Sequence, residues 1–316
     1  MARVALYTHP VAQLHGRPSP AGPPLPHPEQ PDRIASVLTA LSAPAFDALD
    51  RLQAPLADIA TIKKYHDPAY VDQATAPLDD GSIDQLDADT HRTIASAEAA
   101  RRAVGAACDA VKRVIANQID RAFIAMRPPG HHAEHNRAMG FCLFGTVAIA
   151  AQEALASEGI ERVAIVDFDV HHGNGTQELL WNQPNALVIT SQQMPLWPGT
   201  GERTERGAHD QIINIPLPPG SNGEAMREAY KDEVFPALEK FKPDLLLISA
   251  GFDAHVDDPL AGLNWTTEDY VWVTTRLVAL ANKLCHRRVV SCLEGGYDLA
   301  ALSEAVAAHV RCLMSE

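Results

Sequence analysis

Basic side chains are scarce in this sequence of 316 residues, where 26 Lys and Arg stand against 40 Asp and Glu and give a formal net charge of −14. A surface of that sign repels phosphate backbones, so direct binding to nucleic acid is not expected. The same surface attracts cationic substrates over a distance that salt screening limits. The charge therefore excludes one class of partner and favours another without identifying it.

Cysteine is also scarce, and no apolar run approaches the length of a membrane span. The cysteines are odd in number and contain no Cys-x-x-Cys pair, so we expect buried, reduced thiols. The apolar start, Met1–Thr8, is too short to be a signal peptide. These features predict a cytoplasmic protein without membrane contact. The five cysteines are Cys108, Cys142, Cys285, Cys292 and Cys312.

Several common catalytic motifs are absent. The sequence contains no Gly-x-Ser-x-Gly elbow, no phosphate-binding loop and no His-Glu-x-x-His. Residues 173–178 carry only two of the three glycines that a dinucleotide-binding turn needs. Serine hydrolases, P-loop enzymes and dinucleotide-dependent enzymes therefore have no support in the sequence.

Short apolar runs instead alternate with longer amphipathic stretches. Runs of this kind are typical of strands buried on both faces, and the alternation predicts an α/β protein with a parallel sheet and helices on both faces. We expect strands at Arg3–Thr8, Arg121–Met126, Arg162–Asp169, Ala186–Ser191, Asp244–Ala250 and Arg288–Leu293. We expect helices at Ile94–Asn117, Cys142–Ser157, Gly223–Phe241, Thr267–Cys285 and Leu299–Leu313.

The proline-rich stretch Pro18–Pro31 is interpreted as a long surface loop. A linker between domains is the other interpretation, but the one strand that precedes this stretch cannot fold alone. We therefore expect a single domain over residues 1–316.

Polar residues cluster immediately after four of the predicted strands. In a parallel sheet, ligands bind beyond the carboxyl ends of the strands, so clusters at four such ends are expected to converge. The clusters are Arg127–His132, Asp167–Gly175, Ser249–His255 and Glu294–Asp298.

The alternating residues Asp167, Asp169 and His171 predict a metal site. On extended backbone, side chains two positions apart project to the same side. Two carboxylates beside an imidazole repel one another unless a cation or a proton intervenes, and a divalent metal meets that requirement. Asp oxygen with His nitrogen suits zinc. Asp253 is the best candidate for a third ligand, and His255 is a weaker one. A helix-capping Asp beside a surface His is the common alternative, which the flanking strand and the tight turn that follows make less favourable here.

His131 and His132 follow Pro-Pro-Gly, which fixes a rigid turn. Two adjacent imidazoles can act as general base and as electrostatic partner, and Asp167 can fix the tautomer of one of them. Tyr297 follows Gly-Gly and can present its hydroxyl to a developing oxyanion. Taken singly, each of these residues also fits an ordinary loop or rim position.

Together, these segments resemble the zinc-dependent histone deacetylase family, and within it the class II branch and the bacterial histone deacetylase-like amidohydrolases. The resemblance runs from His27 to Tyr297 and rests on four segments in the right order: 127–133 (RPPGHHA), 167–176 (DFDVHHGNGT), 249–254 (SAGFDA) and 294–297 (EGGY). It implies an arginase/deacetylase fold with a central eight-stranded parallel sheet. It also implies a hydrolase that removes acetyl or other acyl groups from lysine side chains or related amines with a metal-activated water.

The resemblance assigns roles to the residues singled out above. Asp169, His171 and Asp253 would hold one catalytic Zn²⁺. His132 would be general base and then acid, His131 with Asp167 would support charge, and Tyr297 would polarise the scissile carbonyl. A structural K⁺ is implied at Asp167, Asp169, His171 and Ser191.

The resemblance also implies an acyl-lysine tunnel. Gly140, Phe141 and Trp197 stand at positions that line it, although Trp197 is usually Phe in the family. Leu260 occupies a position where some polyamine deacetylases carry an acidic residue, which favours an acyl-lysine substrate here. Asn174 replaces an Asp of class I members, as it does in class II-like members.

Three alternatives remain open from the sequence. A deacetylase of acetylpolyamines or another small molecule shares all the chemistry, an arginase-like ureohydrolase needs two metals, and a non-enzymatic acyl-lysine binder would keep only the pocket. The expected partner is an acylated lysine peptide or protein, or an acylated cationic amine. The oligomeric state is open, and a homo-oligomer is among the alternatives.

Overall fold

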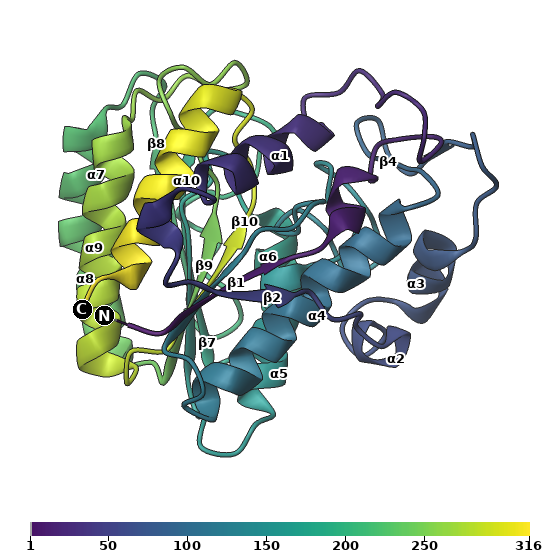
Figure 1. Ribbon diagram of the computed structural model, residues 1–316. Coiled ribbons are helices and arrows are strands. Elements are labelled where there is room, and N and C mark those ends of the chain that lie inside the picture. The colour runs from purple at the N-terminus through teal and green to yellow at the C-terminus, as the bar shows by residue number, and fades with distance from the viewer. Residues whose placement is uncertain (1) are drawn as a thin grey trace.

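The computed structural model describes residues 2–316 and contains a central sheet of eight parallel strands (Figure 1). The strand order is β2-β1-β5-β10-β9-β6-β7-β8. This agrees with the architecture implied by the sequence. The strands are β1 (Val4–Thr8), β2 (Asp50–Gln53), β5 (Arg121–Ile124), β6 (Val163–Asp167), β7 (Ala186–Gln193), β8 (Ile212–Leu217), β9 (Leu245–Ala250) and β10 (Val289–Leu293).

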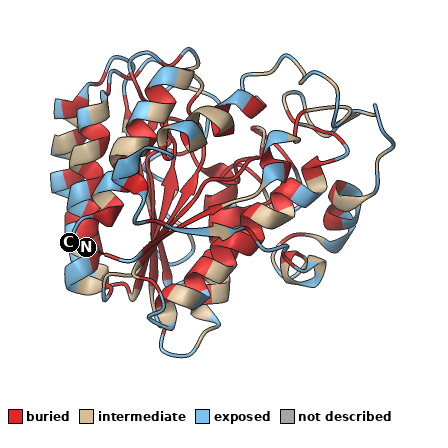
Figure 2. Ribbon diagram, viewed as in Figure 1, coloured by how far each residue is buried: buried red, intermediate tan, exposed pale blue. Residues whose placement is uncertain are grey.

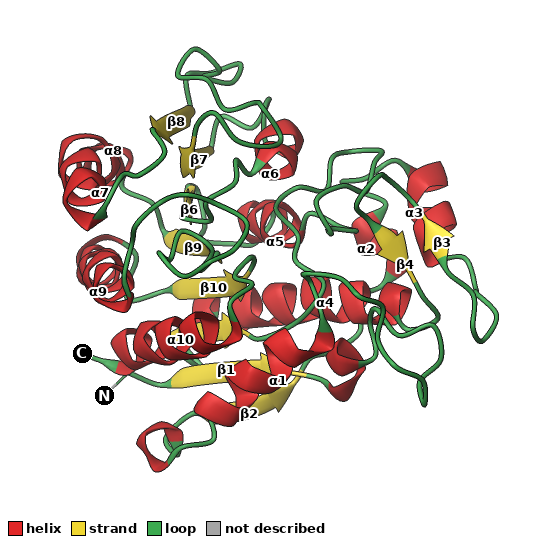
Figure 3. Cartoon of the chain, turned by 90° about the horizontal axis from the view of Figure 1, so that it is seen from above, coloured by secondary structure: helices red, strands yellow, loops and turns green. Residues whose placement is uncertain are grey.

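Helices cover both faces of the sheet (Figure 3). One face is covered by α1 (Pro31–Ala40), α7 (Gly223–Ala229), α8 (Phe235–Phe241), α9 (Thr267–Leu284) and α10 (Leu299–Met314). The other face is covered by α4 (Ser96–Ile115), α5 (Thr146–Leu155) and α6 (Asn174–Leu179). Such two-sided cover follows from parallel strands, since each crossover places a helix on one face.

Smaller elements lie outside these layers. The helices α2 (Ile59–Ile62) and α3 (Pro68–Thr75) lie beyond α4 in Figure 1, with the antiparallel pair β3 (Asp84–Gln85) and β4 (His91–Arg92). Two short 3₁₀ turns, η1 (Pro10–Gln13) and η2 (Pro44–Phe46), complete the N-terminal half. Within residues 2–316, no helix is long and apolar enough to cross a membrane.

The core lies between the sheet and its helices, where the inner strands are buried (Figure 2). All five residues of β6 and all eight of β7 are buried. The helix α4 approaches closely because its inner face is built of alanines such as Ala103, Ala106 and Ala110. Burial on both faces explains why the sequences of the inner strands are continuous apolar runs.

All six predicted strands are present, but β2 and β8 were not predicted. The edge strand β2 has the sequence DRLQ and is mostly exposed, so it shows no apolar pattern. The other edge strand, β8, includes Asn214 and Pro216, and proline in a strand is confined to edges. Edge strands have one unpaired side, so their sequences carry the weakest signal.

The predicted helices are present, with differences in two of them. The helix expected from Cys142 begins only at Thr146, as α5. The stretch expected as a single helix at Gly223–Phe241 consists of α7, a π-helical segment η3 (Tyr230–Val234) and α8. The proline-rich stretch is a loop up to Gln30, as expected, and Pro31 then begins α1. Proline suits this first helical position because its missing N–H would have no partner there.

Arg121 at the start of β5 is fully buried, and its guanidinium hydrogen-bonds to the C-terminal end of α10. Its Nη1 donates to the carbonyl oxygens of Leu313 at 2.5 Å and Ser315 at 2.6 Å, and its Nη2 donates to Asn282 Oδ1 at 2.7 Å. The last carbonyls of a helix have no partner within the helix, so this guanidinium satisfies the buried carbonyl of Leu313 and holds the segment that follows α10.

Replacing Arg121 is therefore expected to destabilise the protein strongly. We expect Arg121→Met to lower the free energy of unfolding by about 2–4 kcal/mol, because buried carbonyls lose charge-assisted hydrogen bonds. Urea unfolding would measure the change. Arg206→Met removes an exposed arginine that pairs with Asp210 at 2.8 Å, and should change stability by less than about 0.5 kcal/mol. Equal stability of the two variants would contradict this role of Arg121.

Candidate active site and metal centre

The four polar clusters predicted from the sequence follow four neighbouring strands of the sheet. The strands β5, β10, β9 and β6 lie side by side and run parallel. Their carboxyl ends therefore deliver the segments that follow them to the same edge of the sheet. The structure brings the clusters together as expected.

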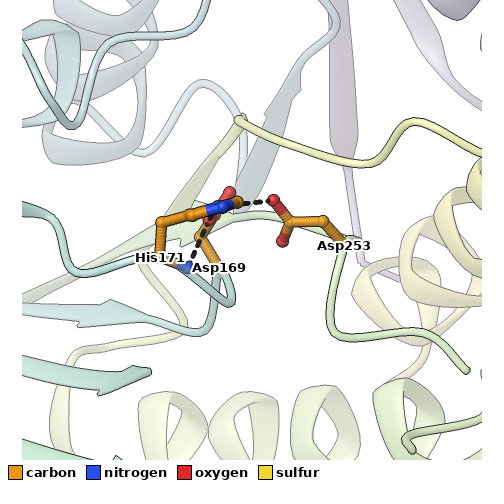
Figure 4. Close-up of side chains that lie close together, drawn as sticks. All are labelled: Asp169, His171 and Asp253. Carbon is orange, nitrogen blue, oxygen red and sulfur yellow. Dashed lines mark hydrogen bonds and ion pairs between the residues drawn. The ribbon is translucent and has the colours of Figure 1, made fainter. Parts of the chain in front are cut away.

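Asp169, His171 and Asp253 form a compact group at this edge (Figure 4). One potential ligand atom of each residue lies within 4.8 Å of the others. His171 Nδ1 is 3.1 Å from Asp169 Oδ1 and 3.1 Å from Asp253 Oδ2. Two carboxylates thus converge on one imidazole nitrogen.

The chemistry of this group fits a divalent cation. Both carboxylates are only 1% exposed, and two buried negative charges repel each other. Burial raises the pKa of Asp253, and the Asp169 carboxylate raises it further. Burial opposes charge on His171, yet its hydrogen bonds to the two carboxylates raise its pKa to about 10. The site therefore demands positive charge, and two oxygens with one nitrogen suit zinc with a coordination position left open.

The surrounding backbone holds the two carboxylates in place. Gly295 N donates to Asp169 Oδ2 at 2.8 Å, and Val170 N donates to Asp253 Oδ1 at 2.9 Å. A Cβ atom on Gly251 would collide with the Asp169 carboxylate, and one on Gly295 would collide with both carboxylates. Glycine at these two positions is what lets the strand ends approach the group so closely.

Two imidazoles stand beside the metal group. His131 Nδ1 is 2.9 Å from Asp167 Oδ2, and its Nε2 is 3.8 Å from Asp169 Oδ2. His132 Nδ1 is 2.8 Å from Asn174 Oδ1. The two ring centroids are 3.8 Å apart, so the charge on one ring affects the other. The predicted pairing of His131 with Asp167 is present.

The two histidines have opposite electrostatic environments. Burial lowers the pKa of His131, but the carboxylates of Asp169 and Asp167 outweigh burial and raise it well above its usual range. Burial and the nearby positive charge of His131 hold the pKa of His132 well below its usual range. These environments favour the protonated form of His131 and the neutral form of His132. A neutral imidazole with Nδ1 directed at Asn174 leaves Nε2 free to accept a proton.

Tyr297 is positioned by contacts that the sequence did not reveal. Its backbone N donates to Asp258 Oδ2 at 2.7 Å. The Arg33 guanidinium carbon lies 4.9 Å from the tyrosine ring centroid. Arg33 also donates to the carbonyl oxygens of Gly296 and Glu294, at 2.6 Å each. The loop that carries Tyr297 is therefore held from beneath by a buried cation.

Arg33 belongs to a buried charge network around Glu29. Arg33 Nη1 is 2.9 Å from Glu29 Oε1, and Arg127 Nη2 is 2.6 Å from Glu29 Oε2. His15 Nε2 lies 3.3 Å from the same carboxylate. Glu29 is 2% exposed and both arginines are fully buried. Two cations around one buried carboxylate lower its pKa and hold the N-terminal segment against the site.

A tunnel of about 200 Å³ leads from the surface to the site. All four residues predicted to line it do so: Gly140, Phe141, Trp197 and Leu260. The catalytic candidates His132 and Tyr297 and the metal-ligand candidate His171 also line it. So do Asp89 and Leu196, which the sequence analysis did not identify. The Trp197 ring lies 4.7 Å from the His132 ring and is 41% exposed, which places it between the mouth and the floor.

Asp89 is the polar group at the tunnel wall. Its Oδ1 accepts hydrogen bonds from Gly140 N at 3.1 Å and Thr90 Oγ1 at 2.9 Å. His27 Nε2 lies 3.2 Å from the Asp89 carbonyl oxygen and its ring packs against Phe141. Asp89 lies in a sequence segment with several other Asp residues, which by itself is typical of a solvated loop, so nothing in the sequence distinguished it.

Ser191, predicted to contribute to a potassium site, lies behind Asp167. Its Oγ is 3.5 Å from the Asp167 carbonyl oxygen and 2.8 Å from the Tyr230 hydroxyl. The serine is buried, as are Asp167 and Asp169. A potassium ion at this place stays a prediction.

The sequence is similar to those of known proteins over nearly its whole length. The family described as Histone deacetylase domain matches residues 27–313. A protein of Arabidopsis thaliana named Histone deacetylase 14, chloroplastic, is 38% identical over 92% of this chain and 73% of its own length. A Histone deacetylase-like amidohydrolase of Pseudomonas aeruginosa is 35% identical over 93% of this chain and 77% of its own length. An uncharacterized protein of Synechocystis is 43% identical over 91% of this chain and 94% of its own length.

The fold is similar to that of a solved structure. The HDA15 HD domain matches 98% of this chain and 88% of its own length, with a TM-score of 0.89 and 31% sequence identity. Fold, sequence and the order of the motifs therefore agree. The chain is a member of the histone deacetylase family.

Proposed function

We propose that this protein is a zinc-dependent amidohydrolase that removes acetyl groups, or other acyl groups, from lysine side chains or related amines. The proposal rests on one observation: three side chains that can bind a metal ion lie beside His132 and Tyr297 in the tunnel. The three are Asp169, His171 and Asp253. The names of the relatives in Arabidopsis thaliana and Pseudomonas aeruginosa agree with this chemistry.

The lining of the tunnel favours a linear side chain that carries an acyl group. Phe141, Trp197 and Leu260 present apolar surface along the walls, where Asp89 is the one acidic group among the lining residues. Apolar walls suit the methylene stem of lysine, and removal of the lysine charge by acylation lets the side chain enter without a large desolvation cost. The tunnel therefore discriminates an acylated amine from a charged one.

Proton transfer falls to His132. When bound, Zn²⁺ would supply a Lewis acid and lower the pKa of a coordinated water. His132 is neutral and its Nδ1 is held by Asn174, so its Nε2 accepts the proton from the attacking water. The same nitrogen then returns the proton to the leaving amine. His131 keeps its proton and offsets the negative charge that develops beside it.

Tyr297 acts as the hydrogen-bond donor to the carbonyl oxygen. Burial raises the pKa of its hydroxyl well above the usual range, although Arg33 opposes the rise. The hydroxyl therefore keeps its proton and can donate it in a hydrogen bond as negative charge develops on the oxygen. A donor fixed before the reaction stabilises that charge without reorganisation.

An acetylpolyamine or similar small cationic amide is the second candidate substrate. The Asp89 carboxylate lies at the tunnel wall and could pair with a second ammonium group of such a substrate. Leu260 favours the acyl-lysine substrate, because an acidic side chain at this position would attract a polyamine more strongly. We also propose a structural K⁺ near Asp167 and Ser191, on the resemblance described above.

Removal of the metal is expected to abolish turnover, and added Zn²⁺ is expected to restore it. Asp253→Asn should weaken zinc binding by at least about 100-fold. Mutation of a residue that only hydrogen-bonds to a metal ligand weakens binding by about 10–100-fold, and replacing the ligand itself should cost more. Competition with a chromophoric chelator measures the affinity. Asp257→Asn changes an exposed carboxylate in the same loop and should bind zinc like the wild type. Two tightly bound metals per chain would instead indicate an arginase-like centre.

Tyr297→Phe is expected to lower kcat by about 100-fold with KM largely unchanged, since it removes a donor used mainly in the transition state. Steady-state kinetics on an acetyl-lysyl peptide provide the measurement. The matched control is Tyr65→Phe, which removes a hydroxyl bonded to Glu153 at 2.8 Å, away from the tunnel. Unchanged turnover in the Tyr297 variant would refute the donor role.

The substrate class is tested by direct comparison. The zinc-reconstituted protein is expected to hydrolyse an acetyl-lysyl peptide with a higher kcat/KM than acetylated polyamines, and chelator should suppress both activities. A preference for polyamines would keep the mechanism and overturn the substrate. Tight binding of the acyl-lysine peptide without any turnover would support the non-enzymatic binder.

A further inference from the structure

Glu294 is a buried carboxylate for which the proposed mechanism has no role. It follows directly after β10 and is 1% exposed. It does not line the tunnel, and it is not part of the metal group. A buried carboxylate is costly unless it is well bonded, so its contacts indicate what it does.

The side chain of Glu294 holds the loop that carries the two histidines. Its Oε2 accepts hydrogen bonds from Gly130 N at 2.7 Å and His131 N at 3.2 Å. Its Oε1 accepts one from Ser249 Oγ at 3.2 Å. One side chain from the end of β10 therefore joins the loop after β5 to the end of β9.

The backbone of Glu294 holds the loop that carries Tyr297. Its N donates to the Ala250 carbonyl oxygen at 2.9 Å, and its carbonyl oxygen accepts from Arg33 Nη2 at 2.6 Å. Tyr297 lies three residues further along the chain. The side chain and the backbone of this one residue thus fix the two halves of the catalytic group, the histidines on one side and the tyrosine on the other.

The packing around these contacts leaves little freedom. A Cβ atom on Gly130 would lie 2.8 Å from Thr146 N and 2.9 Å from the Phe144 carbonyl oxygen, so the histidine loop lies tightly against the start of α5. The cavity beside Glu294 measures about 10 Å³, which is near the minimum that one water needs. A change in the length of the Glu294 side chain therefore has to move the loop itself.

We propose that Glu294 is a positioning residue whose side-chain length sets the distance between His132 and Tyr297. The inference rests on the proposed deacylase function, in which these two residues act on the same amide. Catalytic groups have to be held to within about 0.5 Å, and an error of about 1 Å can reduce the rate by about 100-fold. Glu294 has the contacts to provide that precision.

A purely electrostatic role is the alternative, since the carboxylate lies near the charged ring of His131. Two conservative variants separate the two roles. Burial raises the pKa of Glu294 to about 7. Glu294→Gln keeps the length and an acceptor oxygen for the two N–H groups but removes the ionisable carboxyl group. Glu294→Asp keeps a carboxyl group but shortens the side chain by one methylene, so that group cannot reach the same N–H groups without moving the loop.

We expect Glu294→Gln to retain kcat on an acetyl-lysyl peptide within about fivefold of the wild type. Glu294→Asp should lower kcat by about 10–100-fold with KM within about twofold, the range found when support of a catalytic group is lost. Both variants should still bind one zinc per chain. Glu294→Ala, where it folds, should resemble Glu294→Asp.

The matched control is Asp269→Asn at the start of α9, another buried carboxylate with several hydrogen bonds. It should lower the thermal midpoint while leaving kcat within about twofold, which separates stability from positioning. An Asp variant of Glu294 as active as the wild type, or a Gln variant less active than the Asp variant, would overturn the proposal. Absence of turnover by the wild type would instead count against the proposed function.

Discussion

The burial of two like charges, on Asp169 and Asp253, is the constraint on which the rest of the site depends. Each carboxylate taken out of water costs several kcal/mol unless it is paired and hydrogen-bonded. The backbone N–H groups of Val170 and Gly295 offset part of this cost. The remainder calls for a cation, and the arrangement of the strand ends provides a place for one. Glycine at position 295 is a consequence, because a side chain there would occupy the space of the carboxylates.

A second buried charge network ties the N-terminal segment to this site. Glu29 lies between Arg33 and Arg127, and Arg33 reaches the loop that carries Tyr297. Arg33 and Gly296 are separated by 263 residues in the sequence. The helix α1 is thus more than cover for the sheet, since its first turn places a cation under the tyrosine ring. The two networks meet at Glu294 and Gly295, because Arg33 donates to the Glu294 carbonyl oxygen and Gly295 N donates to Asp169.

The sequence allowed the inner part of the fold to be predicted, because strands buried on both faces are continuous apolar runs. The parallel-sheet rule then placed the polar clusters together, and alternation along extended backbone selected Asp169 and His171. Asp253 followed from its position after a strand. By contrast, the tunnel residues Phe141, Trp197 and Leu260 came only from the family resemblance, since an apolar residue in a loop has no periodic pattern to identify it.

The residues that escaped prediction share a physical reason. Arg33 acts through contacts with distant parts of the chain, and a charged residue at the start of a helix normally indicates solvent. Glu294 belonged to a predicted polar cluster, but its contacts with the histidine loop were not predicted for the same reason. Asp89 lies in an acidic segment in which nothing distinguishes one carboxylate from the next. The edge strand β2 lacks an apolar pattern because it is mostly exposed, whereas the edge strand β8 is mostly apolar but is interrupted by Asn214 and Pro216. Long-range pairing of polar groups is what local sequence patterns do not encode.

The residues proposed to carry out the reaction and those proposed to recognise the substrate lie in different parts of the fold. The metal group, the histidines and Tyr297 follow directly from four inner strands, where any shift is resisted by packing on both faces. Asp89, Trp197 and Leu260 instead belong to loops around the mouth. Changes of residue or length in those loops leave the inner strands in place. Within this architecture, the range of amides accepted can diverge over evolutionary time while the hydrolytic step is inherited unchanged.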